Sequence, residues 1–187
     1  MKIKFKKLHE GARLPKKATE GSAAYDLYLA EDVIIKPGRQ VIPLGFAMEM
    51  PEGIQALIDP RGGFSSKGME GYEVLDIYSY ETPFGTIQGI CTSNPSSAEL
   101  PDCSVMKFVA LEPERFDCDV IEGKIDSDYR KGVGVIVHNR DNRTFLVKAG
   151  TRIAQMTFSK VESPVFEEVE ELSESNRDGG FGSTGTN

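Results

Sequence analysis

The sequence has few cysteines, and their spacing suits neither disulfide cross-linking nor zinc binding. Cys91, Cys103 and Cys118 are the only three in 187 residues, and no two of them form a Cys-x-x-Cys pair. An odd number excludes a closed disulfide framework, and the missing pair argues against a zinc knuckle. We therefore expect free thiols in a chain that is long enough to bury a hydrophobic core of its own.

Long apolar runs and an excess of positive charge are also missing. No stretch approaches the roughly 18 apolar residues of a membrane-spanning helix, and the first seven residues alternate Lys with Ile and Phe rather than forming the apolar core of a signal peptide. The chain carries 22 Lys and Arg against 29 Asp and Glu, a formal charge of −7, whereas wrapping nucleic acid requires clustered basic residues. We expect a cytoplasmic protein that binds neither membranes nor nucleic acid.

Helical periodicity is scarce as well. Apolar residues nowhere keep the i, i+3, i+4, i+7 spacing over three turns, so any helix should be short. They alternate with other residues instead, as at Phe46, Met48 and Met50, and turn signals such as Pro37-Gly38 and Ala149-Gly150 recur at short intervals. This pattern predicts a single all-β domain over residues 1–187, either a sandwich or a barrel.

The clearest strands lie in the C-terminal third. We expect strands at Val133–His138, Thr144–Lys148 and Arg152–Phe158, each rich in β-branched or aromatic residues. The first two are joined by a polar loop centred on Asp141-Asn142, a typical turn sequence. We predict that these two strands form a hairpin and that the third strand follows it.

Two stretches depart from the alternating pattern. Residues 69–118 contain three tyrosines and all three cysteines, and we interpret them as an insertion that projects from the domain. Residues 172–187 are rich in Gly and Ser and follow the acidic run Glu167–Glu171, which predicts a flexible C-terminal tail. The insertion could cap a site or contact an unknown partner, although a plain surface excursion explains it equally well.

Three polar segments have the composition of a binding or catalytic site, but each is ambiguous alone. Asp126–Arg130 contains two carboxylates that would share one face of a strand, and a solvated turn would look the same. Pro60–Lys67 combines a cation with two glycines and two hydroxyls, suited to an anion but also to an ordinary turn. Gly179–Gly185 offers backbone amides for phosphate and one aromatic ring for a base, yet resembles a linker.

A serine hydrolase has no support in the sequence. His9 and His138 are the only histidines, and neither lies near a Ser or Cys in a recognisable nucleophile setting. We expect both histidines to be structural.

Five segments gain meaning from their order along the chain. They are Gly21–Tyr28, Pro60–Gly63, Gly123–Arg130, Gly150–Gln155 and Gly179–Gly185. Together they resemble the five motifs of the homotrimeric dUTPase family, enzymes that convert dUTP to dUMP and pyrophosphate. The resemblance covers residues 1–68 and 119–187. It implies the family's β-barrel or jelly roll, a homotrimer, and a C-terminal tail at 172–187 that closes as a lid over a neighbouring subunit's site.

The resemblance also implies a reaction mechanism. Asp126 would be the general base that orients a water molecule for attack on the α-phosphorus of dUTP. Mg²⁺ on the triphosphate oxygens would assist the displacement, and Asp26 would lie in the outer, water-mediated shell of that metal.

Base and sugar selection are implied in the same way. Tyr129 would pack against the deoxyribose and leave no room for a ribose 2′-hydroxyl. Backbone groups at Gly123, Ile125 and Gly134 would read the uracil edge, and a fixed backbone rejects cytosine because donors and acceptors then mismatch.

Phosphate contacts are implied on the barrel and on the tail. Arg61 and Gln155 would meet phosphate oxygens, together with the backbone of Gly62 and Gly63. The tail residues expected over the nucleotide are Arg177, Phe181, Gly182, Ser183 and Thr184, with Phe181 above the uracil.

Several positions depart from the family pattern. Gly62 stands where a serine hydroxyl usually contacts the phosphate chain, and we hypothesise that Ser65 or Ser66 replaces it, with water as the alternative. Lys131 stands where a glycine is usual. The spacing from Arg177 to Phe181 is one residue shorter than usual.

Three other functions compete with dUTP hydrolysis. A dCTP deaminase on the same fold would need a glutamate base, whereas the third segment is centred on aspartate. A regulatory protein that binds dUTP without turnover would explain Gly62 and the insertion, and the retention of Asp126, Tyr129 and Phe181 speaks against it. An interaction module without a ligand would make the five ordered segments coincidental.

Overall fold

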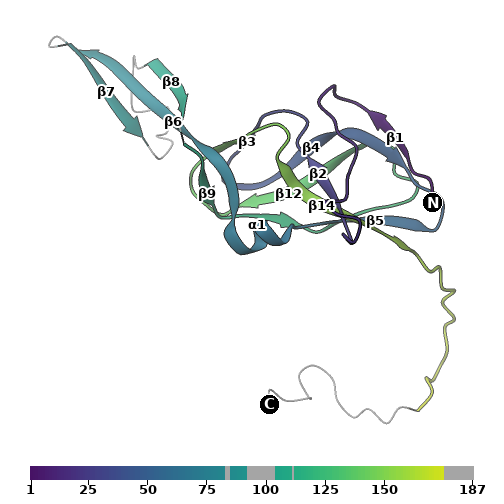
Figure 1. Ribbon diagram of the computed structural model, residues 1–187. Coiled ribbons are helices and arrows are strands. Elements are labelled where there is room, and N and C mark those ends of the chain that lie inside the picture. Colours follow the sequence, from purple (N-terminus) through teal and green to yellow (C-terminus); the bar gives the residue numbers. More distant parts are fainter. Residues whose placement is uncertain (83–84, 92–103, 111, 175–187) are drawn as a thin grey trace.

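The computed structural model describes residues 1–82, 85–91, 104–110 and 112–174, and nearly all of its regular structure is β-strand (Figure 1). The strands form two four-stranded sheets and one six-stranded sheet. Within the described ranges the only helix is α1, Gly62–Lys67, and no helix there is long and apolar enough to cross a membrane. The prediction of an all-β fold with at most a short helix is confirmed.

Two antiparallel four-stranded sheets make up the barrel. The first has the order β1 (Lys4–Lys7), β4 (Gly38–Glu49), β12 (Gly132–Asn139), β10 (Cys118–Ile121). The second has the order β11 (Gly123–Ile125), β5 (Ile54–Asp59), β14 (Arg152–Lys160), β2 (Tyr25–Tyr28).

The third sheet closes one end of the barrel and extends beyond it. Its order is β3 (Val33–Ile35), β13 (Phe145–Val147), β6 (Met69–Thr82), β7 (Gly85–Cys91), and β8 (Ser104–Val109) and β9 (Glu114–Phe116) also pair with β6. β6 begins inside the barrel, where Met69 is fully buried. Its far part runs out with β7 and β8, away from the other two sheets (Figure 1).

The core follows from the period-two pattern of the strands. In β4, Leu44, Phe46 and Met48 point inward, each at most 5% exposed, and alternate valines of β12 do the same from the neighbouring strand. Burying one such side chain is worth roughly 1.5–3 kcal/mol. Phe116 and Phe145 of the third sheet stack with ring centroids 4.0 Å apart, and both belong to the same buried cluster as the side chains of β4 and β12.

The predicted hairpin of Val133–His138 with Thr144–Lys148 is wrong. β12 pairs with β4 and β10, whereas β13 pairs with β3 and β6, so the two strands lie in different sheets. The loop between them turns a corner around the buried side chain of Asn139. That amide donates to the carbonyl of Arg143 (2.9 Å) and accepts from the backbone N–H of Asp141 (2.9 Å). These hydrogen bonds satisfy polar groups of the loop without any pairing of its two flanking strands.

The predicted turn at Pro60–Lys67 is a short helix. The backbone N–H groups of Phe64 and Ser65 both donate to the carbonyl of Arg61 and begin α1. Gly68 ends it with φ of +75°, and a Cβ there would lie 2.4 Å from the carbonyl oxygen of Phe116. Only glycine suits this position, because it alone combines left-handed backbone with so close a contact.

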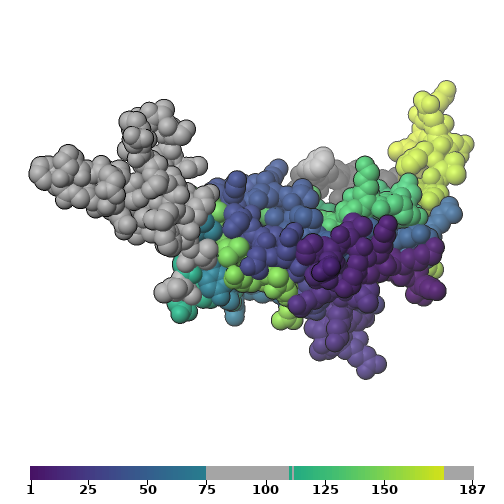
Figure 2. Space-filling view, turned by 90° about the horizontal axis from the view of Figure 1, so that it is seen from above, coloured from purple at the N-terminus to yellow at the C-terminus, as the bar shows by residue number. Residues whose placement is uncertain are grey.

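After β14 the chain leaves the barrel. Residues 161–174 form no strand or helix and extend away from the sheets (Figures 1 and 2). Val165 and Phe166 are 94% and 93% exposed on this segment. Large apolar side chains so open to water are a typical mark of a surface that another chain covers.

Cys118, at the start of β10, is a free and buried thiol. Burial raises its pKa to about 12, and a thiol that stays protonated is neither a nucleophile nor a metal ligand. The expectation of a free thiol is therefore confirmed for this residue.

Candidate active site

The site begins with two strands that follow one another along the chain but do not pair. Among the described residues, β11 is an edge strand bonded only to β5, and the turn at residues 126–131 connects it to β12. β10 pairs with β12 only as far as Ile136, so Gly132–Val135 has no strand partner on that side in the described part of the chain. Two backbone edges with free N–H and C=O groups therefore face one cavity.

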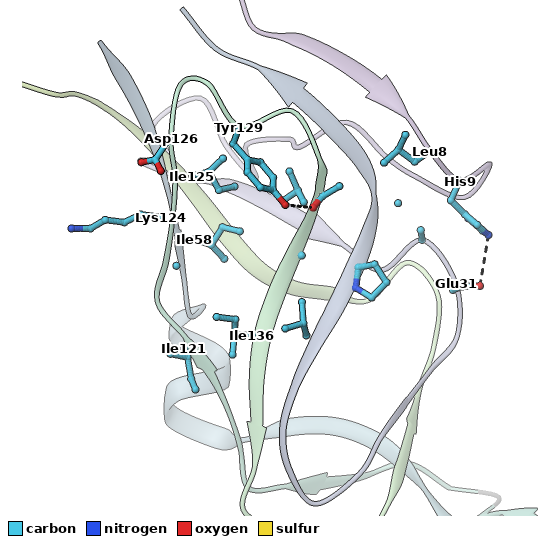
Figure 3. A pocket seen from close by; sticks show the side chains of 18 residues that line it. Leu8, His9, Glu31, Ile58, Ile121, Lys124, Ile125, Asp126, Tyr129 and Ile136 are labelled. Carbon is cyan, nitrogen blue, oxygen red and sulfur yellow. Dashed lines mark hydrogen bonds and ion pairs between the residues drawn. The ribbon is translucent and has the colours of Figure 1, made fainter. Parts of the chain in front are cut away.

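This cavity has a volume of about 550 Å³ and mostly apolar walls (Figure 3). Ile58 and Ile125 line it from one sheet, and Val41 and Ile136 line it from the other. The predicted base-reading residues Gly123, Ile125 and Gly134 are all among its lining residues, together with Asp126 and Tyr129. Apolar walls with a few fixed polar groups are typical of a site for a small organic ligand.

Gly134 leaves its part of the cavity wall without a side chain. It is paired with Pro43 across the sheet, and a Cβ at this position would lie 2.9 Å from Cγ1 of Val41 and 3.3 Å from the carbonyl oxygen of Ile42. A side chain would therefore collide with β4. Without a side chain at Gly134, its backbone borders the cavity directly.

Tyr129 stands at the cavity mouth. Its phenol donates to the carbonyl of Gly132 (3.0 Å), and its backbone N–H donates to the carbonyl of Asp126 (3.1 Å). Arg130 closes the same turn by donating to the carbonyls of Ser127 (2.6 Å) and Tyr129 (3.1 Å). The residue is 40% exposed, so one face of the ring is available to a ligand.

Asp126 follows β11 directly at the rim of the cavity. In Figure 3 its carboxylate and the ammonium of Lys124 lie on the outer side of the strand, away from the cavity interior. Asp126 is exposed. The carboxylate is thus open toward whatever lies outside this barrel, where it could accept a proton from water.

A second cluster of predicted residues lies around Asp26 on β2. Arg61 Nε donates to Oδ1 of Asp26 (2.9 Å), and Arg152 Nη1 donates to Oδ2 (3.3 Å). Gln155 is paired with Asp26 across the sheet and donates from Nε2 to the carbonyl of Pro60 (3.0 Å). The Asp26 side chain is only 10% exposed, so two guanidinium groups share one largely buried carboxylate.

The start of α1 borders this cluster. Gly62 and Gly63 directly follow Arg61, and a Cβ at either glycine would meet nothing within 4 Å. Within the described part of the chain, the hydroxyls of Ser65 and Ser66 make only long contacts of 3.4 Å, to the carbonyls of Arg61 and Gly63. Both hydroxyls can therefore turn toward another acceptor at little cost.

The two clusters lie at opposite ends of β5. Ile125 is opposite Ala56 near the start of that strand, and Arg61 follows its end at Asp59. The five residue-to-residue steps from Ala56 to Arg61 span about 16 Å at about 3.3 Å per step. Within one chain, therefore, Asp126 and Arg61 do not face the same phosphate group.

The metal-binding capacity of the described residues is limited. They contain no group of three or more His, Cys, Asp or Glu side chains that could hold a metal ion. Both oxygens of Asp26 accept hydrogen bonds from arginine, but a carboxylate offers about four lone-pair sites, so each oxygen can also accept a bond from water. This donor set suits Mg²⁺ that arrives on substrate phosphates and keeps its water ligands.

Some residues at these sites were not anticipated from the sequence. Arg152 contacts a carboxylate 126 positions away, which no local pattern could indicate. Leu8 and His9 line the cavity far along its wall from Asp126, and His9 Nε2 lies 3.7 Å from a carboxylate oxygen of Glu31 (Figure 3). The predicted lid residues Arg177, Phe181, Gly182, Ser183 and Thr184 lie outside the described residues.

Comparison with known proteins identifies a family. A family model described as dUTPase matches residues 10–76 and 117–185. Among curated proteins, the deoxyuridine 5′-triphosphate nucleotidohydrolase of Nautilia profundicola is 36% identical, with 99% of each chain covered. The protein of the same name from Vaccinia virus (strain Copenhagen) is 33% identical, with 98% of this chain and 92% of the viral chain covered.

Solved structures agree on the fold. The Staphylococcus bacteriophage 80alpha dUTPase with dUPNHPP superimposes with a TM-score of 0.67 at 23% identity, covering 99% of both chains. The dUTPase from phage phi11 of S. aureus, whose structure visualises a species-specific insert, gives a TM-score of 0.62 at 19% identity, covering 94% of this chain and 100% of that chain.

The family match leaves residues 77–116 uncovered. The proposed insertion at 69–118 is wider than this gap. Met69, Phe116 and Cys118 are all buried in the barrel core, which favours boundaries inside 69–118.

Proposed function

Because this chain belongs to the dUTPase family, we propose that it is a dUTP diphosphatase, which hydrolyses dUTP to dUMP and pyrophosphate. Such a reaction limits uracil in DNA and supplies dUMP for dTMP synthesis. One observation carries the proposal: the cavity between the unpaired edges of β11 and β12 has Asp126 and Tyr129 at its mouth, and both belong to the family-matched part of the chain.

Uracil selection follows from the open backbone edges. A base in the cavity would lie between Gly123 and Ile125 on one side and Gly134 on the other. Backbone N–H and C=O groups have fixed positions, so they discriminate uracil from cytosine by the order of donors and acceptors on the ring. Tyr129, held by its bond to Gly132, would pack on the deoxyribose and exclude a 2′-hydroxyl.

Hydrolysis is assigned to the exposed carboxylate at the cavity rim. Asp126 would take a proton from the water that attacks the α-phosphorus. Arg61 and Gln155, with the backbone of Gly62 and Gly63, would hold the phosphate oxygens. Mg²⁺ bound to the triphosphate would neutralise its charge, with Asp26 contacting the metal's water ligands.

We propose a homotrimer because one chain separates these groups. Ile125, directly before Asp126, is opposite Ala56, which lies about 16 Å from Arg61 along β5 by the rise of a strand. One phosphate chain therefore reaches both Asp126 and Arg61 only if a second copy supplies one of the two clusters. The apolar residues Val165 and Phe166, exposed beyond β14, support contact with another copy. The tail with Arg177, Phe181, Gly182, Ser183 and Thr184 would close the site as a lid. The cytoplasmic location stays a prediction.

The experiment is pyrophosphate release from dUTP with Mg²⁺, run beside dCTP, dTTP and UTP, with each product identified. Release from dUTP alone supports the proposal, including base and sugar selection. Deoxyuridine nucleotides formed from dCTP would instead indicate a deaminase. Tight dUTP binding without release would indicate a regulatory protein, in which Gly62 has replaced a hydroxyl needed for turnover.

A further inference from the structure

Arg152 begins β14 and pairs with Asp26, but the proposed mechanism does not use it. We propose that Arg152 is a positioning residue: its guanidinium holds one oxygen of Asp26 and thereby keeps Arg61 turned toward the phosphates. This role rests on the proposed function, since it concerns how the same site presents Arg61 to the triphosphate of dUTP.

The geometry around Asp26 is divided between the two arginines. Arg61 reaches Oδ1 through Nε (2.9 Å), and its Nη1 donates to the backbone carbonyl of Arg152 (3.2 Å). Arg152 reaches Oδ2 through its own Nη1 (3.3 Å). The Nε and Nη1 groups of Arg61 are thus both engaged, and among the residues that the structure describes its Nη2 group has no hydrogen-bond partner, so it can meet another acceptor.

A carboxylate and an arginine normally prefer a different arrangement. The favoured geometry is a fork in which two N–H groups meet both carboxylate oxygens. Arg61 does not form this fork with Asp26: only its Nε contacts the carboxylate, at Oδ1, while Arg152 holds Oδ2. If the Arg152 side chain were removed, the carboxylate could rotate about its broad χ2 torsion and take Arg61 with both oxygens. Arg61 would then lose donors that the substrate needs.

Charge and exposure support a functional role over a structural one. Two guanidinium groups against one carboxylate leave one positive charge in excess beside the start of α1, which favours an anionic ligand. The side chain of Arg152 is 50% exposed, whereas that of Arg61 is 25% exposed. Arg152 is half exposed, and Asp26 keeps Arg61 as a partner when the Arg152 side chain is removed, so its removal should affect catalysis more than folding.

The test is a double-mutant cycle on dUTP hydrolysis with Arg152→Met, Arg61→Met and the double variant. The carbonyl of Arg152 that accepts from Arg61 is backbone and remains in every variant. We expect Arg152→Met to lower kcat/KM about tenfold, the effect of losing one charge-assisted contact. In the Arg61→Met background the same change should cost less than about twofold, because Arg152 acts through Arg61.

Two further variants separate positioning from general effects. Arg152→Lys should recover activity to within about threefold of the wild type, since an ammonium can still donate to Oδ2. Arg140→Met is the matched control, because Arg140 is also an exposed arginine paired with one aspartate, Asp119, and it should leave kcat/KM unchanged. Thermal melting checks that each variant is folded. If Arg152→Met does not fold, Arg152→Lys is the variant on which the test is made.

The outcomes are distinct. Wild-type protein that releases no pyrophosphate from dUTP contradicts the proposed function itself. Active wild type with Arg152→Met equal to Arg140→Met overturns the positioning role alone. Losses that add in the cycle also overturn it, because Arg152 would then act independently of Arg61.

Discussion

The phenol of Tyr129 donates a 3.0 Å hydrogen bond to the backbone carbonyl of Gly132, the first residue of β12. This bond ties the turn after β11 to the strand across the cavity, although β11 and β12 do not pair. The ring is therefore held at the mouth by its far end, while 40% of the residue stays exposed. A fixed ring is a better steric filter than a mobile one, because it cannot move aside for a larger ligand.

The first prediction concerns this filter. Tyr129→Ala should raise turnover of UTP relative to dUTP by at least about tenfold, because the 2′-hydroxyl is then no longer excluded. Tyr129→Phe keeps the ring and loses only the bond to Gly132, so it should change the ratio by less than about threefold. The ratio of kcat/KM for the two nucleotides is the measurement. An unchanged ratio in Tyr129→Ala would remove Tyr129 from sugar selection.

The second prediction assigns the general base. Asp126→Asn should reduce pyrophosphate release by roughly 10²–10⁴-fold, the usual contribution of a positioned base, while dUTP still binds. Asp128→Asn is the matched control, because Asp128 is an exposed carboxylate two residues along the same turn. Single-turnover kinetics measure the loss of hydrolysis, and calorimetry measures dUTP binding. An equal loss of pyrophosphate release in both variants would mean that hydrolysis depends on the net charge of the turn and not on a general base at Asp126.

The third prediction concerns the hydroxyl missing at Gly62. A side chain fits there, since a Cβ would meet nothing within 4 Å. If Ser65 or Ser66 supplies the hydroxyl, replacing both with alanine should lower kcat about tenfold, and Gly62→Ser should restore it in that background. Each hydroxyl makes only one 3.4 Å contact, to a carbonyl at the start of α1, so the alanines should leave stability nearly unchanged. Unaltered kcat in the double alanine variant would leave water as the substitute.

The sequence predicts local features of this protein better than its long-range contacts. Alternation correctly places the strands, since a half-buried strand needs an apolar residue at every second position, as in β12. The order of five short motifs correctly identifies the family, because motif order survives where overall identity is low. Asp126 and Tyr129 do line one cavity, as their shared motif implies.

Contacts between distant segments could not be predicted. Periodicity fixes which face of a strand is buried but not which strand lies beside it, so the predicted pairing of β12 with β13 is wrong. The pairing of Arg152 with Asp26 joins residues 126 positions apart. The separation of Asp126 from Arg61 depends on the register of β11 with β5. Neither relationship leaves a pattern in the sequence near the residues concerned.

The last prediction concerns Arg143, which fastens the base of β6 to the corner between β12 and β13. Its guanidinium contacts Asp141 (2.8 Å), Glu73 on β6 (3.3 Å) and Glu114 on β9 (2.7 Å), and its side chain is 29% exposed. The hydrogen bond from Arg143 holds the pKa of Asp141 below its ordinary value. Arg143→Met should therefore lower the melting temperature at neutral pH by about 3–6 °C, the equivalent of roughly 1–2 kcal/mol.

The pH dependence distinguishes this network from simple packing. Because the pKa of Asp141 is depressed in the folded state, its stabilisation is complete above about pH 4, the pKa of an unfolded aspartate, and is lost as the pH falls through the lower folded value. The difference between wild type and Arg143→Met should thus shrink as the pH falls from about 5 to about 3, the range in which aspartates titrate. Melting curves across this range measure it, with Arg140→Met as the exposed-pair control. A difference that stays constant down to the acid limit would mean that Arg143 acts through its contact with the Phe145 ring, 5.0 Å away, and not through Asp141.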